Sequence, residues 1–285
     1  MQLYVIRVPL GNSAISAVYG LLPNKQQRSY EAVIKATLDR CEELGFTPDP
    51  TVIVTDFETS AMNAVQVTLG HHVRTQGCFY HLTQSTWRKI QDLGLVQKYR
   101  NEEEIKHFVG MLDGLAFLPL ADVEEGMALL KNATPEGLEE LVDYFDSTYV
   151  SGSISRVQPS QNNALTLQLR RRPPLFPPQT WNVHDVTLTG GDRTNNMCES
   201  WNHAFSHLVG HKHPSLWTLI DSLRKDYALV SLALLQQDCG QPPKKRVKRS
   251  TKLHQERLYE ICIARRDGQK TIEQTLKAMG YCIRP

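Results

Sequence analysis

Two acidic residues have positions that suit carboxylate chemistry. Asp56 directly follows the apolar run Thr51–Thr55, and Glu199 lies in a segment of helical character. A short β-branched run is typical of a buried central strand, and catalytic groups gather at the carboxyl ends of such strands. Asp56 could equally be the N-cap of the helix that follows, and one side chain can fill both roles. The sequence therefore offers Asp56 as a candidate carboxylate and leaves both roles open.

Glu199 also has two interpretations. Asn196 followed three residues later by Glu199 approximates a capping box, which requires no active site. Glu199 and His203 are four residues apart and share one helix face, so both could line a cleft. Spacing alone does not choose between these interpretations.

Two cysteine–histidine pairs could bind a metal ion. Cys78 with His81, and Cys198 with His203, supply the ligand types of a Cys2His2 zinc site. No compact zinc finger separates the pairs, so we favour a structural role. In that interpretation Cys78 is half-buried, and His81 caps or hydrogen-bonds at a junction between a strand and a helix.

A basic run follows two prolines near the C-terminal end of the sequence. Its members are Lys244, Lys245, Arg246, Lys248 and Arg249. Because Pro242 and Pro243 keep this run extended, we favour nuclear localisation. Contact with phosphates and a solvated hinge are the alternatives.

The composition is that of an ordinary globular protein, with 41% apolar and 22% charged residues in 285. No apolar run approaches the roughly 20 residues needed to cross a bilayer, so we expect no membrane contact. Six cysteines without CxxC spacing suit a reducing compartment. Charge is unevenly distributed along the sequence. Residues 101–150 have 2 basic and 12 acidic side chains, a net charge of −10. Residues 240–285 have 12 basic and 4 acidic side chains, a net charge of +8.

The elements that must position these residues alternate between strands and helices. We expect a hairpin of strands Gln2–Val8 and Ala14–Leu22, a helix Ser29–Leu44 capped by Ser29, a strand Thr51–Thr55, a helix Glu58–Leu69, a strand His72–Phe79 and a helix His81–Tyr99. This order predicts an α/β fold.

The remaining two thirds of the sequence are mostly helical in pattern. We expect helices with acidic faces in residues 101–150, an extended linker or surface arm in residues 151–180 that holds Arg170–Arg172, and helices at Asn196–Val209, Pro214–Gln237 and Leu253–Arg265. Four regions result: residues 1–100, the first part of an α/β core; 101–190, an acidic helical insertion and proline-rich arm; 191–238, the closing helices; and 239–285, a basic segment.

Five strings, taken in order, resemble the transposase domain of Mutator-like elements of the animal type. They are LLPNK (Leu21–Lys25) with Tyr30, TDFE (Thr55–Glu58) with Asn63-Ala64, GCFYHLTQ (Gly77–Gln84), Gly94-Leu95 with Tyr99, and TNNMCESWNHAF (Thr194–Phe205). The resemblance extends from about residue 2 to about residue 230. Each string is weak alone, but five in the right order are fairly specific.

The resemblance implies a ribonuclease-H-like mixed sheet flanked by helices, with an all-helical insertion. It also implies an Asp, Asp, Glu triad that holds two Mg²⁺ or Mn²⁺ ions for cutting and joining DNA strands, since such ions prefer carboxylates. Asp56 matches the second aspartate and Glu199 the glutamate, and Cys78 and His81 match a CxxH motif. The implied partner is DNA, with self-association as a further expectation.

The sequence departs from the family at the first aspartate. In the family this residue lies on the first strand, just upstream of the segment that Gln2–Val8 resembles, whereas the first acidic residue here is Glu31. We therefore expect an N-terminally truncated domain without that strand, an exposed sheet edge and impaired catalysis.

The leading hypothesis is thus a nuclear, transposase-derived catalytic core, related to DNA transposition but impaired. The alternative is a domesticated nuclear DNA-binding or interaction protein without catalysis. A zinc-stabilised interaction module built on the two cysteine–histidine pairs is a third.

Overall fold

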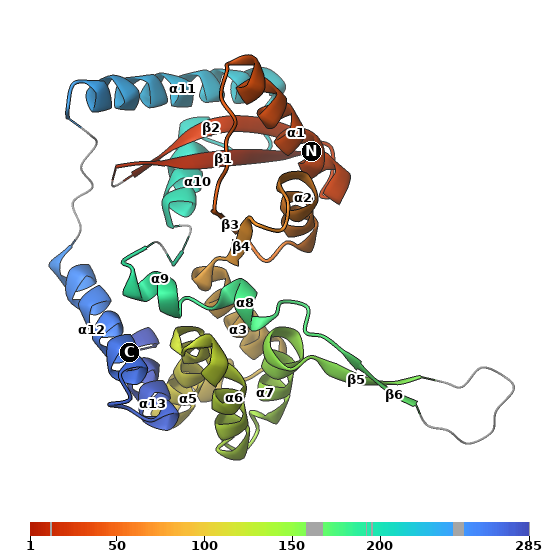
Figure 1. Cartoon of the computed structure of the whole chain (residues 1–285), viewed down its shortest axis with the longest axis vertical. Helices are drawn as coiled ribbons and strands as arrows, with labels where there is room; N and C mark the ends of the chain where they lie inside the picture. Colours follow the sequence, from red (N-terminus) through yellow and green to blue (C-terminus); the bar gives the residue numbers. More distant parts are fainter. Residues whose placement is uncertain (12, 158–167, 192, 195, 242–247, 285) are drawn as a thin grey trace, which may run out of the picture. The chain divides into compact units, whose positions relative to one another are not determined.

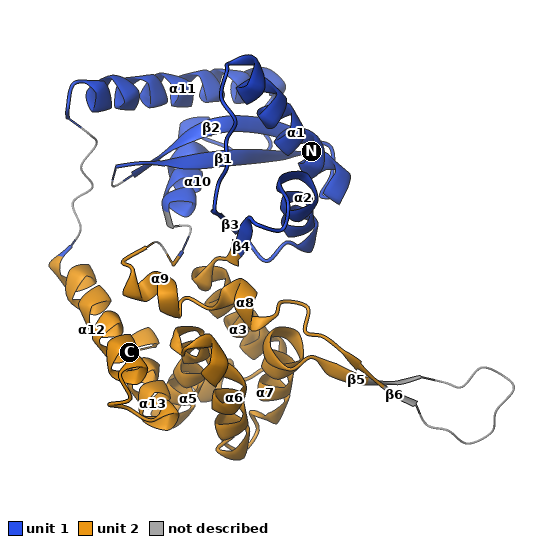
Figure 2. Ribbon diagram, in the orientation of Figure 1, with its two compact units in different colours: residues 1–75, 194–248 blue, residues 76–193, 249–285 orange. Residues whose placement is uncertain are grey.

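The chain folds into two compact units, each assembled from two stretches of sequence (Figure 2). The computed structural model describes residues 1–285 except 12, 158–167, 192, 195, 242–247 and 285. Unit 1 comprises residues 1–75 and 194–248, and unit 2 comprises residues 76–193 and 249–285.

Unit 1 begins with the predicted hairpin (Figure 1). Strand β1, Gln2–Leu10, pairs antiparallel with β2, Ser13–Leu22, and the register shifts between Ile6 and Arg7. Gly11, at the turn, has a φ of 56°, a conformation that glycine adopts without steric cost. β-Branched and aromatic residues in both strands favour this pairing.

The next elements of unit 1 also follow the predicted order. They are helix α1, Gln27–Glu43, strand β3, Val52–Thr55, helix α2, Thr59–Leu69, and strand β4, Arg74–Gly77, which continues into unit 2. The predicted cap of α1 is wrong, because the helix starts two residues before Ser29. The Ser29 hydroxyl instead donates a 2.9 Å hydrogen bond to the side chain of Asn24.

One hydrophobic core joins the hairpin to these helices. Its buried members come from β2, α1, α2 and the residue before β4: Leu22, Tyr30, Ile34, Ala61, Ala64, Val65 and Val73. Tyr4 from β1 and Ile53 from β3 pack against it. Burial of these side chains fixes β1 and β3 on the same helices.

The strands do not form the single mixed sheet that the family resemblance implies. The described residues form three two-stranded sheets, β1–β2, β3–β4 and β5–β6. The chain is therefore mixed α/β, mostly helical with small sheets. Because β1 and β3 each have one partner strand in the described structure, each keeps one hydrogen-bonding edge outside a ladder.

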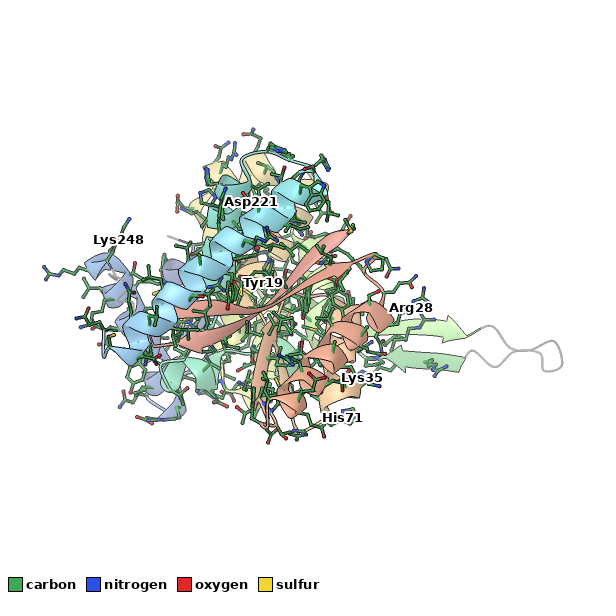
Figure 3. All side chains as sticks on the ribbon, turned by 90° about the horizontal axis from the view of Figure 1, so that it is seen from above. Tyr19, Arg28, Lys35, His71, Asp221 and Lys248 are labelled. Atoms are coloured by element: carbon green, nitrogen blue, oxygen red, sulfur yellow. The ribbon has the colours of Figure 1, made fainter. Side chains whose placement is uncertain are left out.

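Two long helices complete unit 1. Helix α10, Asn196–Val209, has its predicted bounds, and α11 spans Leu216–Asp238. In Figure 3, α11 crosses the hairpin close to Tyr19. The Tyr19 hydroxyl donates a hydrogen bond to buried Asp226 of α11. Burial, followed by this bond, raises the pKa of Tyr19 to about 12.

Unit 2 is a helical unit. Its helices are α3, Phe79–Asp92; α4, Val96–Asn101; α5, Glu103–Gly114; α6, Val123–Asn132; α7, Glu139–Phe145; α8, Pro178–Trp181; α9, His184–Leu188; α12, Arg249–Arg266; and α13, Ile272–Ile283. Short 3-10 turns occupy Leu115–Phe117 and Leu120–Asp122, and a π turn occupies Asp146–Val150. The residues buried most deeply include Phe108, Leu112, Phe117, Phe145 and Trp181.

Several predicted elements of this unit differ from the observed ones. The predicted helix His81–Tyr99 is two helices, α3 and α4, separated at Gly94, where φ is +70°. Helix α12 starts four residues before the predicted Leu253, and α13 was not predicted. None of the helices in the described part of the chain is both long and apolar enough to span a bilayer.

Residues 151–180 also differ from the prediction. Of the two alternatives, extended linker or surface arm, the linker is wrong, because this stretch contributes strand β5, Ser153–Val157, which pairs antiparallel with β6, Gln168–Arg172, and then the short helix α8. The three predicted arginines thus lie on a strand rather than in irregular chain.

Candidate functional site

Asp56 lies where the sequence places it, directly after the last residue of β3. Its side chain is exposed, and its backbone carbonyl accepts a 2.7 Å hydrogen bond from the amide of Glu58. The capping interpretation of Asp56 is wrong, because the N-cap position of α2 belongs to Glu58. The Asp56 carboxylate is thus presented at the carboxyl end of a strand, at the surface of unit 1.

Tyr4 of β1 marks the point where three segments of unit 1 meet. The pKa of its phenol is raised, first by burial and then by the negative charges of Glu58, Asp56 and Cys198. Electrostatic effects of this kind require short distances in a protein. The structure therefore brings Asp56 and the first turn of α10, which holds Cys198 and Glu199, into the surroundings of one hydroxyl.

Glu58, the other carboxylate that raises the pKa of Tyr4, stabilises the packing of the core. It accepts a 2.7 Å hydrogen bond from the hydroxyl of Tyr30 and lies 3.5 Å from the ammonium of Lys25. Burial and this contact raise the pKa of Tyr30. These two donors occupy the Glu58 carboxylate.

Helix α10 is held in unit 1 by an aromatic face. The Trp201 indole donates to Asp226 at 2.9 Å, stacks on Phe205 with ring centres 4.8 Å apart, and lies under the Arg7 guanidinium at 5.5 Å. Cys198, Trp201 and Phe205 share this face because they are three and four residues apart. The face fixes the first turn of α10, and with it the backbone of Glu199.

Glu199 and His203 differ in exposure, and their shared role in a cleft stays a prediction. His203 is exposed, and its Nε2 lies 3.2 Å from Nε2 of His207, one turn further along α10. Glu199 is half-buried. The side chain of Asn196 lies outside the described residues, so the capping box stays a prediction.

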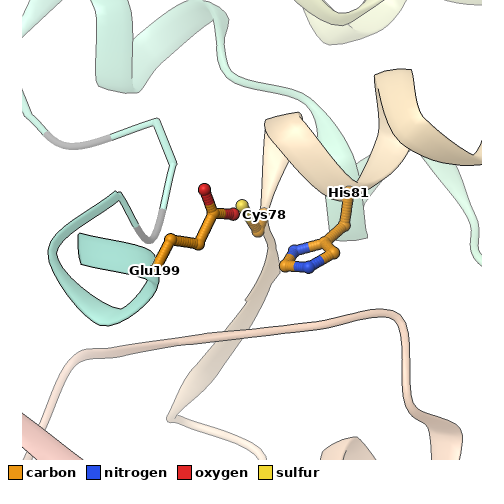
Figure 4. Close-up of side chains that lie close together, drawn as sticks. All are labelled: Cys78, His81 and Glu199. Atoms are coloured by element: carbon orange, nitrogen blue, oxygen red, sulfur yellow. The ribbon is translucent and has the colours of Figure 1, made fainter. Parts of the chain in front are cut away.

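Cys78 and His81 flank the start of α3. Cys78 is the N-cap residue and fully buried, rather than half-buried as predicted, and His81 lies in the first turn. Figure 4 shows their side chains together with that of Glu199. The Cys78 sulfur and a ring nitrogen of His81 lie within 4.8 Å of each other. Cys78 and His81 belong to unit 2, whereas Cys198 and His203 belong to unit 1, and the four-ligand zinc site stays a prediction.

The basic run is described only in part. Lys244, Lys245 and Arg246 lie outside the described residues, whereas Lys248 and Arg249 are exposed where α12 begins. Two members of the predicted localisation signal are therefore accessible at the surface.

Sequence reasoning missed two contributors to this region, Tyr4 and Glu58. Glu58 stood in the TDFE string, but its contact with Tyr30 spans 28 residues and carries no local signal. Tyr4 could have been noticed from strand alternation, which places it with Gln2 and Ile6 on one face of β1.

Comparison with known proteins gives one family match. Residues 1–85 match the family model of the MULE transposase domain. The match supports the Mutator-like family. It includes Asp56, Cys78 and His81, whereas Glu199 lies beyond it. A transposase domain implies interaction with DNA. No curated protein and no solved structure matches the chain.

Proposed function

We propose that this chain is a transposase-derived core related to DNA transposition, with Asp56 and Glu199 as the carboxylates of a metal-dependent site for DNA strand cleavage and transfer. The observation that carries the proposal is the match of residues 1–85 to the MULE transposase domain. The position of Asp56 after β3 supports the assignment, as does the pKa of Tyr4, which both Asp56 and Cys198 of α10 help to raise.

The donor set suits one hard divalent cation. Two carboxylates with water molecules can hold Mg²⁺ or Mn²⁺, which would activate a water or hydroxyl for attack on a phosphodiester. Two ions about 4 Å apart need more shared oxygen ligands than Asp56 and Glu199 provide. Glu58 does not extend the set, because Tyr30 and Lys25 occupy its carboxylate.

We therefore propose that catalysis is impaired in this chain for want of a third carboxylate. The free edges of β1 and β3 support this view, since a further strand carrying an aspartate could pair there. In the family that strand precedes the segment that β1 resembles.

The test is nicking of a labelled DNA duplex in Mg²⁺ or Mn²⁺. We expect weak or no nicking by the chain as given and nicking by a form extended upstream with an aspartate-bearing strand. In the extended form, Asp56→Ala and Glu199→Gln should each abolish nicking, and Asp39→Asn, at an exposed position on α1, should not. Nicking that survives Asp56→Ala would refute the assignment.

The alternative is a domesticated nuclear DNA-binding or interaction protein without catalysis. The exposed Lys248 and Arg249 favour it, since they belong to the basic run that also suggests a nuclear location. If neither form nicks DNA in either metal but both bind it, this alternative replaces the first.

The nuclear location is tested with a fluorescent fusion of the chain in which Lys248 and Arg249 are changed to Gln. We expect this variant to lose nuclear accumulation. Unchanged accumulation would contradict the localisation signal.

A further inference from the structure

The hairpin β5–β6 projects from the helices of unit 2 (Figure 1). Its base is firmly held. Gly152, with φ of +78°, lies so close to the carbonyl of Arg172 that a Cβ there would be 2.1 Å away. Beyond the hairpin, the Phe176 amide donates to the Thr148 carbonyl at 3.0 Å. Contacts on both sides of the hairpin therefore join its base to the rest of unit 2.

The strand β6 concentrates positive charge on this ribbon. Arg170, Arg171 and Arg172 are consecutive and exposed. Because side chains alternate along a strand, Arg170 and Arg172 belong to one face and Arg171 to the other. Arg171 pairs in register with Ile154, whose exposed fraction is 71%. Both faces of the hairpin therefore carry an arginine.

The charge of the ribbon contrasts with that of its own unit. Residues 101–150, which form helices α5 to α7, carry 2 basic and 12 acidic side chains. A large polyanion would be repelled by those acidic faces and attracted to the arginines. The hairpin is therefore a part of unit 2 that suits a polyanion.

We infer that the β5–β6 hairpin is a contact element for duplex DNA, with Arg170 and Arg172 on phosphates. The inference rests on the proposed function, in which the chain acts on DNA. A two-stranded ribbon fits the major groove, which is about 12 Å wide. Arginine forks match phosphate oxygens, and residues two apart on a strand are separated by roughly 6.7 Å, close to the spacing of neighbouring phosphates. Because Arg171 lies on the opposite face, a ribbon in the groove can contact phosphates on both sides of the groove.

The experiment measures binding of a fluorescein-labelled 20-base-pair duplex by anisotropy over a range of KCl concentrations. Each phosphate contact contributes about −0.9 to the slope of log K against log salt. The double variant Arg170→Gln/Arg172→Gln should therefore bind more weakly and show a slope smaller by about 2. The matched control is Arg88→Gln/Arg100→Gln, which removes the same charge from exposed positions on α3 and α4 and should leave the slope nearly unchanged.

The outcomes separate this inference from the proposed function. If the intact chain does not bind duplex DNA, the DNA contact in the proposed function fails and the hairpin inference falls with it. If the chain binds but both double variants behave alike, the hairpin inference is overturned and the proposed function stands. Tighter binding of a single strand through the same two arginines would overturn the assignment to duplex. An unchanged thermal midpoint of each variant shows that folding does not explain a loss.

Discussion

A buried ion pair ties the last helix of unit 2 to its core. The carboxylate of Asp113, on α5, is fully buried and lies 2.7 Å from the guanidinium of Arg284, immediately after α13. The other carboxylate oxygen accepts a 2.7 Å hydrogen bond from Thr86 of α3. Arg284 also donates to the Tyr99 hydroxyl at 3.2 Å. Both charges are therefore paired and hydrogen-bonded.

Replacing Arg284 with Met should destabilise the chain strongly. The substitution keeps most of the side-chain volume but leaves the Asp113 carboxylate buried without its cation. Breaking a buried pair in this way costs about 3–5 kcal/mol. At about 2–4 °C per kcal/mol, this corresponds to a fall of about 6–20 °C in the Tm of the cooperative transition. Thermal unfolding followed by circular dichroism and denaturant titration measure both quantities.

Two further variants test the reasoning. Arg266 forms an exposed pair with Asp267 at 2.9 Å, so Arg266→Met should cost far less stability than Arg284→Met. The double variant Asp113→Leu/Arg284→Met removes both buried charges and should recover most of the lost stability. The explanation is refuted if Arg284→Met costs no more than Arg266→Met, or if the double variant is no more stable than Arg284→Met alone.

The remaining predictions concern other buried contacts. Burial lowers the pKa of His184 below its usual 6.5, so the stability that this neutral side chain contributes above that pH should be lost as the pH falls. Measurement of Tm against pH should therefore show a smaller loss on acidification for His184→Leu than for the unmodified chain. A Cβ on Gly110 would lie 2.5 Å from the carbonyl of Gly280, so Gly110→Ala should cost about 1–3 kcal/mol in denaturant titration, and an unchanged midpoint would contradict the close crossing of α5 and α13. Asp226→Ala should cost about 1–3 kcal/mol by leaving the Trp201 indole without its acceptor, and an unaltered tryptophan emission would contradict that contact.

Local patterns predicted most elements of unit 1. The hairpin, β3, α2 and α10 were found close to their predicted bounds because alternation and helical spacing are properties of neighbouring residues. The same spacing failed at Gly94, where one glycine with positive φ divides a continuous amphipathic pattern. Strands β5 and β6 were not predicted, because the prolines of residues 151–180 favoured an extended linker or surface arm.

The candidate site was predicted in its residue types but not in its surroundings. The strand that ends before Asp56 and the helix that holds Glu199 both follow from sequence. The assignment of Asp56 as a cap failed because Glu58 takes that position. The groups that raise the pKa of Tyr4 could not be predicted from local patterns, because they include Cys198 of α10, almost 200 residues further along the chain.

The sequence by itself determined the order of strands and helices, the separation of acidic and basic regions and the resemblance to a transposase domain. These depend on residue type and short-range spacing. The tertiary structure decided which groups are paired: Glu58 with Tyr30, Asp226 with Trp201, and Asp113 with Arg284. It also decided that Arg170–Arg172 lie exposed on strand β6. Such pairings arise from burial, which brings distant residues together and requires buried polar groups to find partners.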